Sequence, residues 1–408
     1  MLKKISSTFV IMVISMLSSF LVTIILGRIL QPNEFGEFSL LKQIIVIGPT
    51  IAIFGLGHSY IKLFSKIQNK NDNIHKITIL FAFLISAIIS LFIKFIYELS
   101  IIKILFVFLS IWFCSISLYL AANFRVKEKF FIAQLFQSGW KILLLLCILF
   151  LLFWRLYIDI DIIYRIIVIS VLIPASIIIP KILSKSERRI EYNIEIRNYI
   201  TFGIMFWLIN STGLMFGAID KLIIPITFNN ETLGIYTALS FLFTVSLTMI
   251  GSSIGYVIFP TISKGKQVNW KKLFSVIGII IILSFIVFSV AGEYLVSLLF
   301  KGKYDSYNNL FFVFCFTLLG SMQFIHVILH FIIAGKGDRK NLVEYWIYCL
   351  STIILFLMIV FISNRLIEYD LKIFTLNVLF IWFIKILMML YLIKKMSKQN
   401  SQLEFAVK

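Results

Sequence analysis

The chain has 408 residues, of which 60% are hydrophobic and 14% are charged, and its formal net charge is +19. An ordinary soluble domain carries about 25% charged residues, so this composition excludes an ordinary soluble protein and indicates a lipid bilayer as the solvent. The basic residues are scattered between apolar runs and form no basic domain or stripe, which argues against nucleic acid as a partner. The four cysteines lie inside apolar runs without CxxC spacing, so the sequence predicts neither a disulfide framework nor a cysteine metal site.

The first apolar run predicts a membrane span and not a cleavable signal peptide. Lys3 and Lys4 precede a run over 5–26, which is too long for the apolar region of a signal peptide and ends without a small-residue cleavage site.

Apolar runs of the length that crosses a bilayer, roughly 17–25 residues, continue along the chain. The runs predict about twelve transmembrane helices, over 5–27, 39–63, 77–97, 100–122, 130–153, 162–183, 199–219, 234–259, 273–292, 309–334, 343–363 and 373–393. We therefore expect an all-α integral membrane protein.

The basic residues also predict an orientation. Most of them fall in the N-terminus, in alternate loops and in the C-terminal tail, and cytoplasmic loops carry the excess of Lys and Arg. Both termini are thus expected in the cytoplasm. The connecting segments are short, so we expect no soluble catalytic domain and a transporter, not an enzyme.

A charged segment over 184–198 divides the spans six and six. We predict an N-terminal six-helix lobe over 1–183, a cytoplasmic linker over 184–198, a C-terminal six-helix lobe over 199–393 and a cytoplasmic tail over 394–408. The linker has the composition of an amphipathic helix lying on the membrane surface.

The two predicted lobes begin alike. After the first span comes R-I-L-Q-P-N-E-F-G-E-F over 28–38, and after the seventh come D-K at 220–221 and N-E-T-L-G-I-Y over 230–236. Each combines a charged residue at the membrane edge, an acidic turn and Gly-x-aromatic at the start of the next helix. The pattern indicates a parallel internal repeat of the kind found in two-lobed transporters.

These segments resemble the polysaccharide biosynthesis branch, which includes the O-antigen flippases, of the multidrug/oligosaccharidyl-lipid/polysaccharide exporter superfamily. Further similar segments are D-K-L-x-x-P over 220–225, L-G-x-Y-x-A over 233–238, F-P-T-I-S over 259–263 and G-K-Y over 302–304. The resemblance implies two six-helix bundles arranged as a V, with a central cavity that opens alternately to each side.

The resemblance also implies the activity. The expected function is a flippase of the bacterial cytoplasmic (inner) membrane that carries polyprenyl-diphosphate-linked oligosaccharide repeat units, for O-antigen or a similar surface polysaccharide, to the outer leaflet. Its expected partners are this lipid-linked substrate and membrane lipids, with polysaccharide polymerase and chain-length machinery as further candidates. We expect a functional monomer without a cofactor. The alternatives are a multidrug or other small-molecule exporter of the same superfamily, a polysaccharide polymerase or glycosyltransferase, and a scaffold without transport activity.

Lys141 is the strongest candidate for substrate binding within a span. An ionisable residue in mid-membrane costs roughly 2.5–3.5 kcal/mol on insertion scales, so it usually faces a cavity. Gln134, Gln137, Ser138 and Lys141 share one face of a continuous helix, as expected for a helix that lines an anion path. The alternative is a lysine that extends to the membrane interface from a lipid-facing helix.

Other charged residues leave two interpretations open. Lys385, deep in the last span, fits cavity lining and extension to the interface equally well. Arg28, at the outer end of the first span, either seals the cavity mouth or anchors the helix in the headgroups. Lys42, one turn inside the second span, is expected to extend to the interface.

Polar residues within the spans have similarly open roles. His326 and His330 are one turn apart, a spacing that can bind a metal, but without acidic or thiol partners we favour interhelical hydrogen bonding or cavity lining. Asn210 either joins helices or contacts substrate.

Carboxylates are missing from the middle of the predicted spans, and Asp220 at the outer edge of the seventh comes nearest. A cavity with cations and no carboxylates suits an anionic substrate. We hypothesise that Asp220 pairs with Arg28 across the lobes and closes an outer gate.

Overall fold

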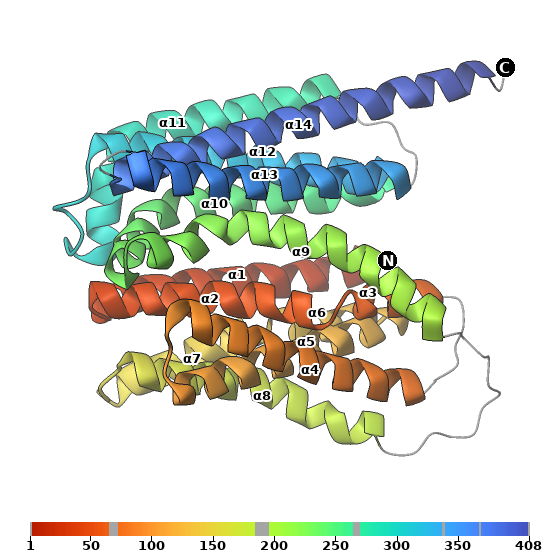
Figure 1. Cartoon of the computed structure of the whole chain (residues 1–408), viewed down its shortest axis with the longest axis horizontal. Helices are drawn as coiled ribbons and strands as arrows, with labels where there is room; N and C mark the ends of the chain where they lie inside the picture. The colour runs from red at the N-terminus through yellow and green to blue at the C-terminus, as the bar shows by residue number, and fades with distance from the viewer. Residues whose placement is uncertain are drawn as a thin grey trace. The chain divides into compact units, whose positions relative to one another are not determined.

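The computed structural model describes residues 2–64, 72–183, 196–263, 270–336, 339–366 and 369–406, and their regular structure is helical throughout (Figure 1). By their internal contacts the residues form two compact units, which we call the N-terminal unit (Met1–Leu233) and the C-terminal unit (Gly234–Lys408). The predicted linker lies outside the described residues over 184–195. Residues 199–233, which the predicted division assigns to the second lobe, are grouped with the N-terminal unit.

Two sets of helices build the units. Those of the N-terminal unit are α1 (Leu2–Ile29), α2 (Pro32–Ala52), α3 (Leu56–Phe64), α4 (Asp72–Tyr97), α5 (Ile101–Val126), α6 (Phe130–Ser138), α7 (Trp140–Phe153), α8 (Ile160–Leu183) and α9 (Ile196–Thr227). Those of the C-terminal unit are α10 (Asn230–Ser263), which begins just before the boundary, α11 (Trp270–Phe300), α12 (Leu310–Lys336), α13 (Arg339–Leu366) and α14 (Leu371–Ala406).

The described residues contain ten helices long and apolar enough to cross a membrane, or eleven if the bent pair α6–α7 forms one span. The all-helical membrane fold is thus as predicted. The sequence predicted about twelve spans. The predicted span that is not among these eleven, over 162–183, coincides with α8, whose side chains are described only as far as residue 176.

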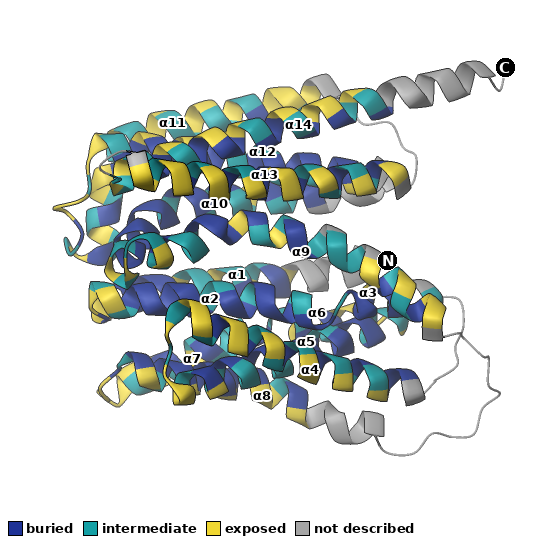
Figure 2. Cartoon of the chain, viewed as in Figure 1, coloured by how far each residue is buried: buried dark blue, intermediate teal, exposed yellow. Residues whose placement is uncertain are grey.

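The outer faces of these helices are apolar. In α11 only 6% of the span is buried, against 72% in α2, and large apolar side chains such as Val290 and Phe95 are more than four-fifths exposed. Figure 2 shows exposed residues along the faces of α4 and α13. Such faces are stable only in contact with lipid tails.

Polar side chains cap the N-termini of α2 and α10. Pro32 occupies the first turn of α2, and the Glu34 carboxylate accepts a hydrogen bond from the Gln31 backbone N–H at 3.1 Å, closing a capping box. At the start of α10, the Asn229 side chain accepts from the Thr232 backbone N–H at 2.8 Å. These contacts give Glu34 of the first repeat segment, and Asn229 just before the second, a structural role in capping helices.

The structure breaks two helices that the sequence predicted as continuous. The span over 39–63 is divided into α2 and α3 by Phe54 and Gly55, both at positive φ. The span over 130–153 is bent by 53° between α6 and α7, at Gly139. The Cβ of any larger residue at Gly139 would lie 2.4 Å from the Leu135 carbonyl oxygen, so this bend requires glycine.

An ion pair joins three helices at one end of the N-terminal unit. The Lys103 ammonium of α5 lies 2.6 Å from a Glu37 carboxylate oxygen of α2, and the Tyr164 hydroxyl of α8 donates to the same oxygen at 3.0 Å. The Glu37 side chain is only 11% exposed. This buried carboxylate is therefore held by a cation and a phenol within the helix bundle.

We expect Glu37→Gln to destabilise the N-terminal unit, because the Lys103 ammonium would lose its nearer and more buried counter-charge and keep, among the described residues, only the exposed Asp161 carboxylate at 3.8 Å. Removing one partner of a buried pair costs about 3–5 kcal/mol, and less where water reaches it. The measurement is the thermal unfolding midpoint in detergent. Glu34→Gln, at the exposed cap of the same helix, is the control and should lower the midpoint much less; an equal effect of the two changes would contradict the role of the ion pair.

Helix α9 packs along α2, α3 and α4 of the N-terminal unit. Near its start, the Tyr199 backbone carbonyl accepts from the Ser59 hydroxyl at 2.7 Å, and the Tyr199 phenol pairs with Thr78 at 2.9 Å. Near its end, the Leu222 carbonyl accepts from the Tyr97 phenol at 2.9 Å. The helix is thus fixed to the N-terminal unit close to both of its ends.

Candidate substrate-binding site

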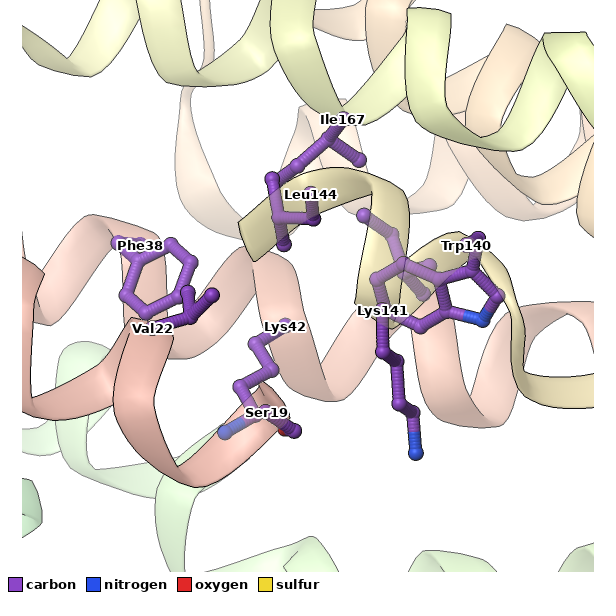
Figure 3. A pocket seen from close by; sticks show the side chains of 9 residues that line it. Ser19, Val22, Phe38, Lys42, Trp140, Lys141, Leu144 and Ile167 are labelled. Carbon is purple, nitrogen blue, oxygen red and sulfur yellow. The ribbon is translucent and has the colours of Figure 1, made fainter. Parts of the chain in front are cut away.

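A pocket in the N-terminal unit contains the strongest sequence candidate, Lys141. Helices α1, α2, α7 and α8 form its walls (Figure 3), and its lining residues are Ser19, Val22, Phe38, Lys42, Ile45, Trp140, Lys141, Leu144 and Ile167. The lining is apolar apart from one hydroxyl, the indole and two ammonium groups. A pocket of this kind can hold an apolar body together with an anionic group.

The two lysines reach the pocket from different helices. The Lys42 ammonium donates to the Thr23 hydroxyl at 2.7 Å, which ties α2 to α1. Figure 3 shows Lys42 and Lys141 extending in the same direction, away from Leu144 and Ile167. Both side chains are half-buried. The Lys42 ammonium is thus bound to a hydroxyl of the neighbouring helix, and its extension to the membrane interface remains a prediction.

The bend at Gly139 decides where Lys141 lies. Helix α7 starts directly after the bend, with Trp140 and Lys141 in its first turn, and the Lys141 ammonium lies 5.8 Å from the centre of the Trp140 ring. The indole face gives the cation a weak partner but no counter-charge. The ammonium remains able to bind an anion.

A further lysine, Lys221, lies close to Lys42 of the pocket. Lys221 of α9 and Lys141 both lie near enough to Lys42 for their charges to repel the Lys42 charge. Asp220, the neighbour of Lys221, is buried, and its carboxylate accepts from the Lys221 backbone N–H at 2.9 Å. Like charges held together in a poorly solvated place raise the free energy of the empty site, and an anion relieves this cost.

The predicted polar face of the fifth span is split by the bend. Gln134 is buried in α6, and its amide donates to the Ser138 hydroxyl at 3.1 Å. Gln137 accepts a hydrogen bond from the Arg125 guanidinium of α5. The sequence argument assumed a continuous helix, and this assumption was wrong: the two glutamines precede the 53° bend and Lys141 follows it.

The remaining candidates of the N-terminal unit are less closely grouped. Arg28 is exposed in the last turn of α1, and Asn210 is half-buried in the middle of α9. The pairing of Arg28 with Asp220 and the gate that it would close remain predictions.

The candidates of the C-terminal unit lie together in its interior. Lys385 of α14 is 1% exposed and His326 of α12 is 9% exposed, and Lys385 acts electrostatically on both His326 and His330. The described residues contain no group of three or more His, Cys, Asp or Glu that could hold a metal ion. Their grouping follows from the packing of α12 against α14 and could not be predicted from spacing alone.

Sequence reasoning gave no site role to four residues of the N-terminal unit, Lys42, Trp140, Lys221 and Glu37, although it considered Lys42 as an interface residue. Each stands near the end of an apolar run or beside another polar residue, where interface anchoring is the common role. The one available signal was the position of Glu37 and Lys221 within the two repeat segments.

Comparison with known proteins adds a family and a fold. The family model described as "Polysaccharide biosynthesis protein" matches residues 1–266, and no curated protein matches the chain. The chain is similar to a solved multidrug resistance MATE family transporter of the MOP superfamily, in an inward-facing conformation, with 14% sequence identity and a TM-score of 0.57. The alignment covers 95% of this chain and 96% of that transporter, so the exporter fold spans the chain.

Proposed function

Because this chain belongs to the polysaccharide biosynthesis protein family, we propose that it flips polyprenyl-diphosphate-linked oligosaccharides, such as O-antigen repeat units, across the bacterial cytoplasmic membrane. It is a membrane transporter by fold. The substrate would enter from the inner leaflet and leave into the outer leaflet. Polymerase and chain-length machinery would use the product on the outer side, and the transporter would act as a monomer.

The observation that carries this proposal is the group of lysines in the N-terminal unit. Lys42 and Lys141 line one pocket, and Lys221 lies within electrostatic reach of Lys42. Lysine binds phosphate as a point charge, and a diphosphate would offset the positive charges of Lys42 and Lys141 in the pocket. The apolar wall of the pocket would lie against the first isoprene units or an apolar sugar face.

The physics of the bilayer explains why such a carrier is needed. Sugars and a diphosphate cannot leave water for about 30 Å of hydrocarbon without a polar path. The headgroup would occupy the transporter while the polyprenyl tail stays in the lipid. An inside-negative potential drives an anion outward by about 2.3 kcal/mol per charge per 100 mV, so the potential favours the proposed direction.

Export of cationic drugs is the second candidate, since the similar solved structure is a multidrug transporter. A site for a cationic drug needs carboxylates. The pocket presents two ammonium groups instead, and the nearby carboxylate of Glu37 is already bound by Lys103. The charge of the pocket therefore favours an anionic substrate.

Depletion of the protein in the bacterium that encodes it tests the proposal. We expect the lipid-linked repeat unit to accumulate and to be accessible to a lectin only from the cytoplasmic face, in inverted membrane vesicles. Expression of the wild-type chain should restore access in right-side-out vesicles. If the repeat unit still reaches the outer face after depletion, the proposed function is wrong.

A further inference from the structure

The interior of the C-terminal unit contains a second group of titratable side chains, which the proposed substrate pocket does not use. Lys385 stands in the middle of the span Leu371–Met396 of α14 and is 1% exposed. His326 and His330 belong to α12, and Tyr345 and Cys349 belong to α13. We call these five residues the basic cluster.

Contacts connect the basic cluster into a closed ring. His326 and His330 have ring centres 6.3 Å apart, and His330 Nδ1 lies 3.1 Å from the Tyr345 hydroxyl. Tyr345 interacts with the Cys349 thiol one turn further along α13, and that thiol interacts with the Lys385 ammonium. Trp382 closes the ring, because its indole lies 5.7 Å from Lys385 Nζ and 5.2 Å, edge to face, from the His326 ring.

One nitrogen of the basic cluster is unsatisfied. His326 Nε2 is buried and has no hydrogen-bond partner among the described residues. A buried polar atom without a partner costs about 1–3 kcal/mol. An imidazole nitrogen in this state can accept a proton, and it would then need a different partner or a different conformation.

The chemistry of the basic cluster selects its ligand. Its members are an amine, two imidazoles, a phenol and a thiol, whereas hard metal cations prefer carboxylate and carbonyl oxygens. At their contacts with α12, the other packed helices present glycines: Gly251 and Gly255 of α10 and Gly292 of α11. The group that acts electrostatically on Lys385 is the Cys349 thiol, a member of the basic cluster. The ion that such bases exchange is the proton.

The protonation of Lys385 and that of the histidines depend on each other. Lys385 acts electrostatically on both His326 and His330, and two positive charges so close in a poorly solvated interior repel strongly. A proton held by one member therefore disfavours a proton on the next.

We propose that Lys385, His326 and His330 form a proton-exchange site through which transport is coupled to the proton gradient. The step is a proton transfer alone: an N–H bond forms with a proton taken from water on one side of the membrane, and the same proton returns to water on the other side. Proton exchange by the cluster does not depend on the proposed substrate, whereas its coupling to flipping rests on the proposed function.

Purified protein in lipid vesicles tests this proposal with two readouts. A trapped pH-sensitive dye follows proton movement under an imposed pH gradient, with the membrane potential clamped, and a membrane-impermeant lectin follows flipping of polyprenyl-diphosphate oligosaccharide. We expect Lys385→Met and His326→Gln to reduce protein-dependent proton movement to the level of protein-free vesicles. Flipping driven by a pH gradient should be lost in both variants, whereas flipping driven by a membrane potential should continue.

Two controls separate proton exchange from a structural role. Lys394→Met removes an exposed lysine of the same helix and should leave both readouts unchanged. His326→Gln places a polar amide at the site, but this group cannot bind a proton. Loss of proton movement with retained potential-driven flipping would therefore show that His326 is needed for proton exchange and not for the fold.

The outcomes for the cluster and for the substrate are distinct. Unchanged proton movement in Lys385→Met and His326→Gln would overturn the proton-exchange site, and so would the absence of any protein-dependent proton movement in the wild type. Proton movement that depends on Lys385, in vesicles where the wild type flips no oligosaccharide, would support the site and overturn the proposed substrate.

Discussion

Replacing Lys141 by alanine is expected to lower the rate of oligosaccharide flipping by roughly ten- to a hundredfold. A hydrogen bond to a charged group contributes about 1.5–3 kcal/mol, and each 1.4 kcal/mol is a factor of ten. Lys42→Ala should have an effect of similar size, because both ammonium groups face the same pocket. The measurement is the initial flipping rate in vesicles that contain equal amounts of folded protein.

Two further variants make this prediction specific. Lys141→Arg keeps the positive charge and should retain much of the rate. Lys129→Ala removes an exposed lysine just before α6, close to Lys141 in sequence but outside the pocket, and should leave the rate unchanged. Equal rates for the wild type, Lys141→Ala and Lys42→Ala would show that the pocket does not bind the substrate.

The double variant Lys42→Ala/Lys141→Ala tests whether the two lysines bind the same group. If both contact one diphosphate, the loss in the double variant should differ from the sum of the two single losses by about 0.5–3 kcal/mol. Additive losses would place the two lysines on separate parts of the substrate.

The second large effect is expected at the break between α2 and α3. Gly55 has φ of +67°, and a Cβ built there would lie 2.1 Å from the Gly203 carbonyl oxygen and 2.7 Å from the Trp207 backbone nitrogen, both on α9. Gly55→Ala would therefore meet backbone atoms that cannot move aside and would strain its own backbone as well. We expect a loss of several kcal/mol, or failure to fold, since overpacking alone costs about 1–3 kcal/mol.

Gly203→Ala should act in the same direction with a smaller effect. Its Cβ would lie 2.8 Å from the Leu56 side chain and 3.0 Å from the Phe54 carbonyl oxygen. Gly213→Ala on the same helix is the matched control, because within the described part of the chain no atom lies within 4 Å of its Cβ. The thermal unfolding midpoint in detergent should rank Gly55→Ala below Gly203→Ala, and Gly203→Ala below Gly213→Ala.

A Gly203→Ala protein as stable as Gly213→Ala would contradict the close approach of α9 to the α2–α3 break. A Gly55→Ala protein of wild-type stability would contradict the left-handed turn itself. Both results can be obtained without any transport assay.

The membrane fold could be predicted from hydropathy because each span is a local property of some 20 residues. The breaks in those spans could not. Gly139 and Gly55 each stand inside an apolar run, where glycine is equally compatible with a straight membrane helix, and only their contacts with Leu135 and Gly203 require the bend and the break.

The candidate site was predictable in part for the same reason. Lys141 was found because a lysine deep in an apolar run is costly wherever it points. The bond of Lys42 to Thr23 could not be predicted, because it joins two helices and no spacing within one helix reveals such a contact. The buried Glu37 was overlooked because its partners, Lys103 and Tyr164, are 66 and 127 residues away in the chain.

The most direct test of the account is a leaflet-resolved assay on the purified wild-type protein. Vesicles would contain polyprenyl-diphosphate oligosaccharide together with a cationic dye, and the rates at which each crosses the membrane would be measured in the same sample. The account predicts that the oligosaccharide becomes accessible to the membrane-impermeant probe while the dye stays in place. Movement of the dye without movement of the oligosaccharide would contradict it and would identify the protein as a cation exporter.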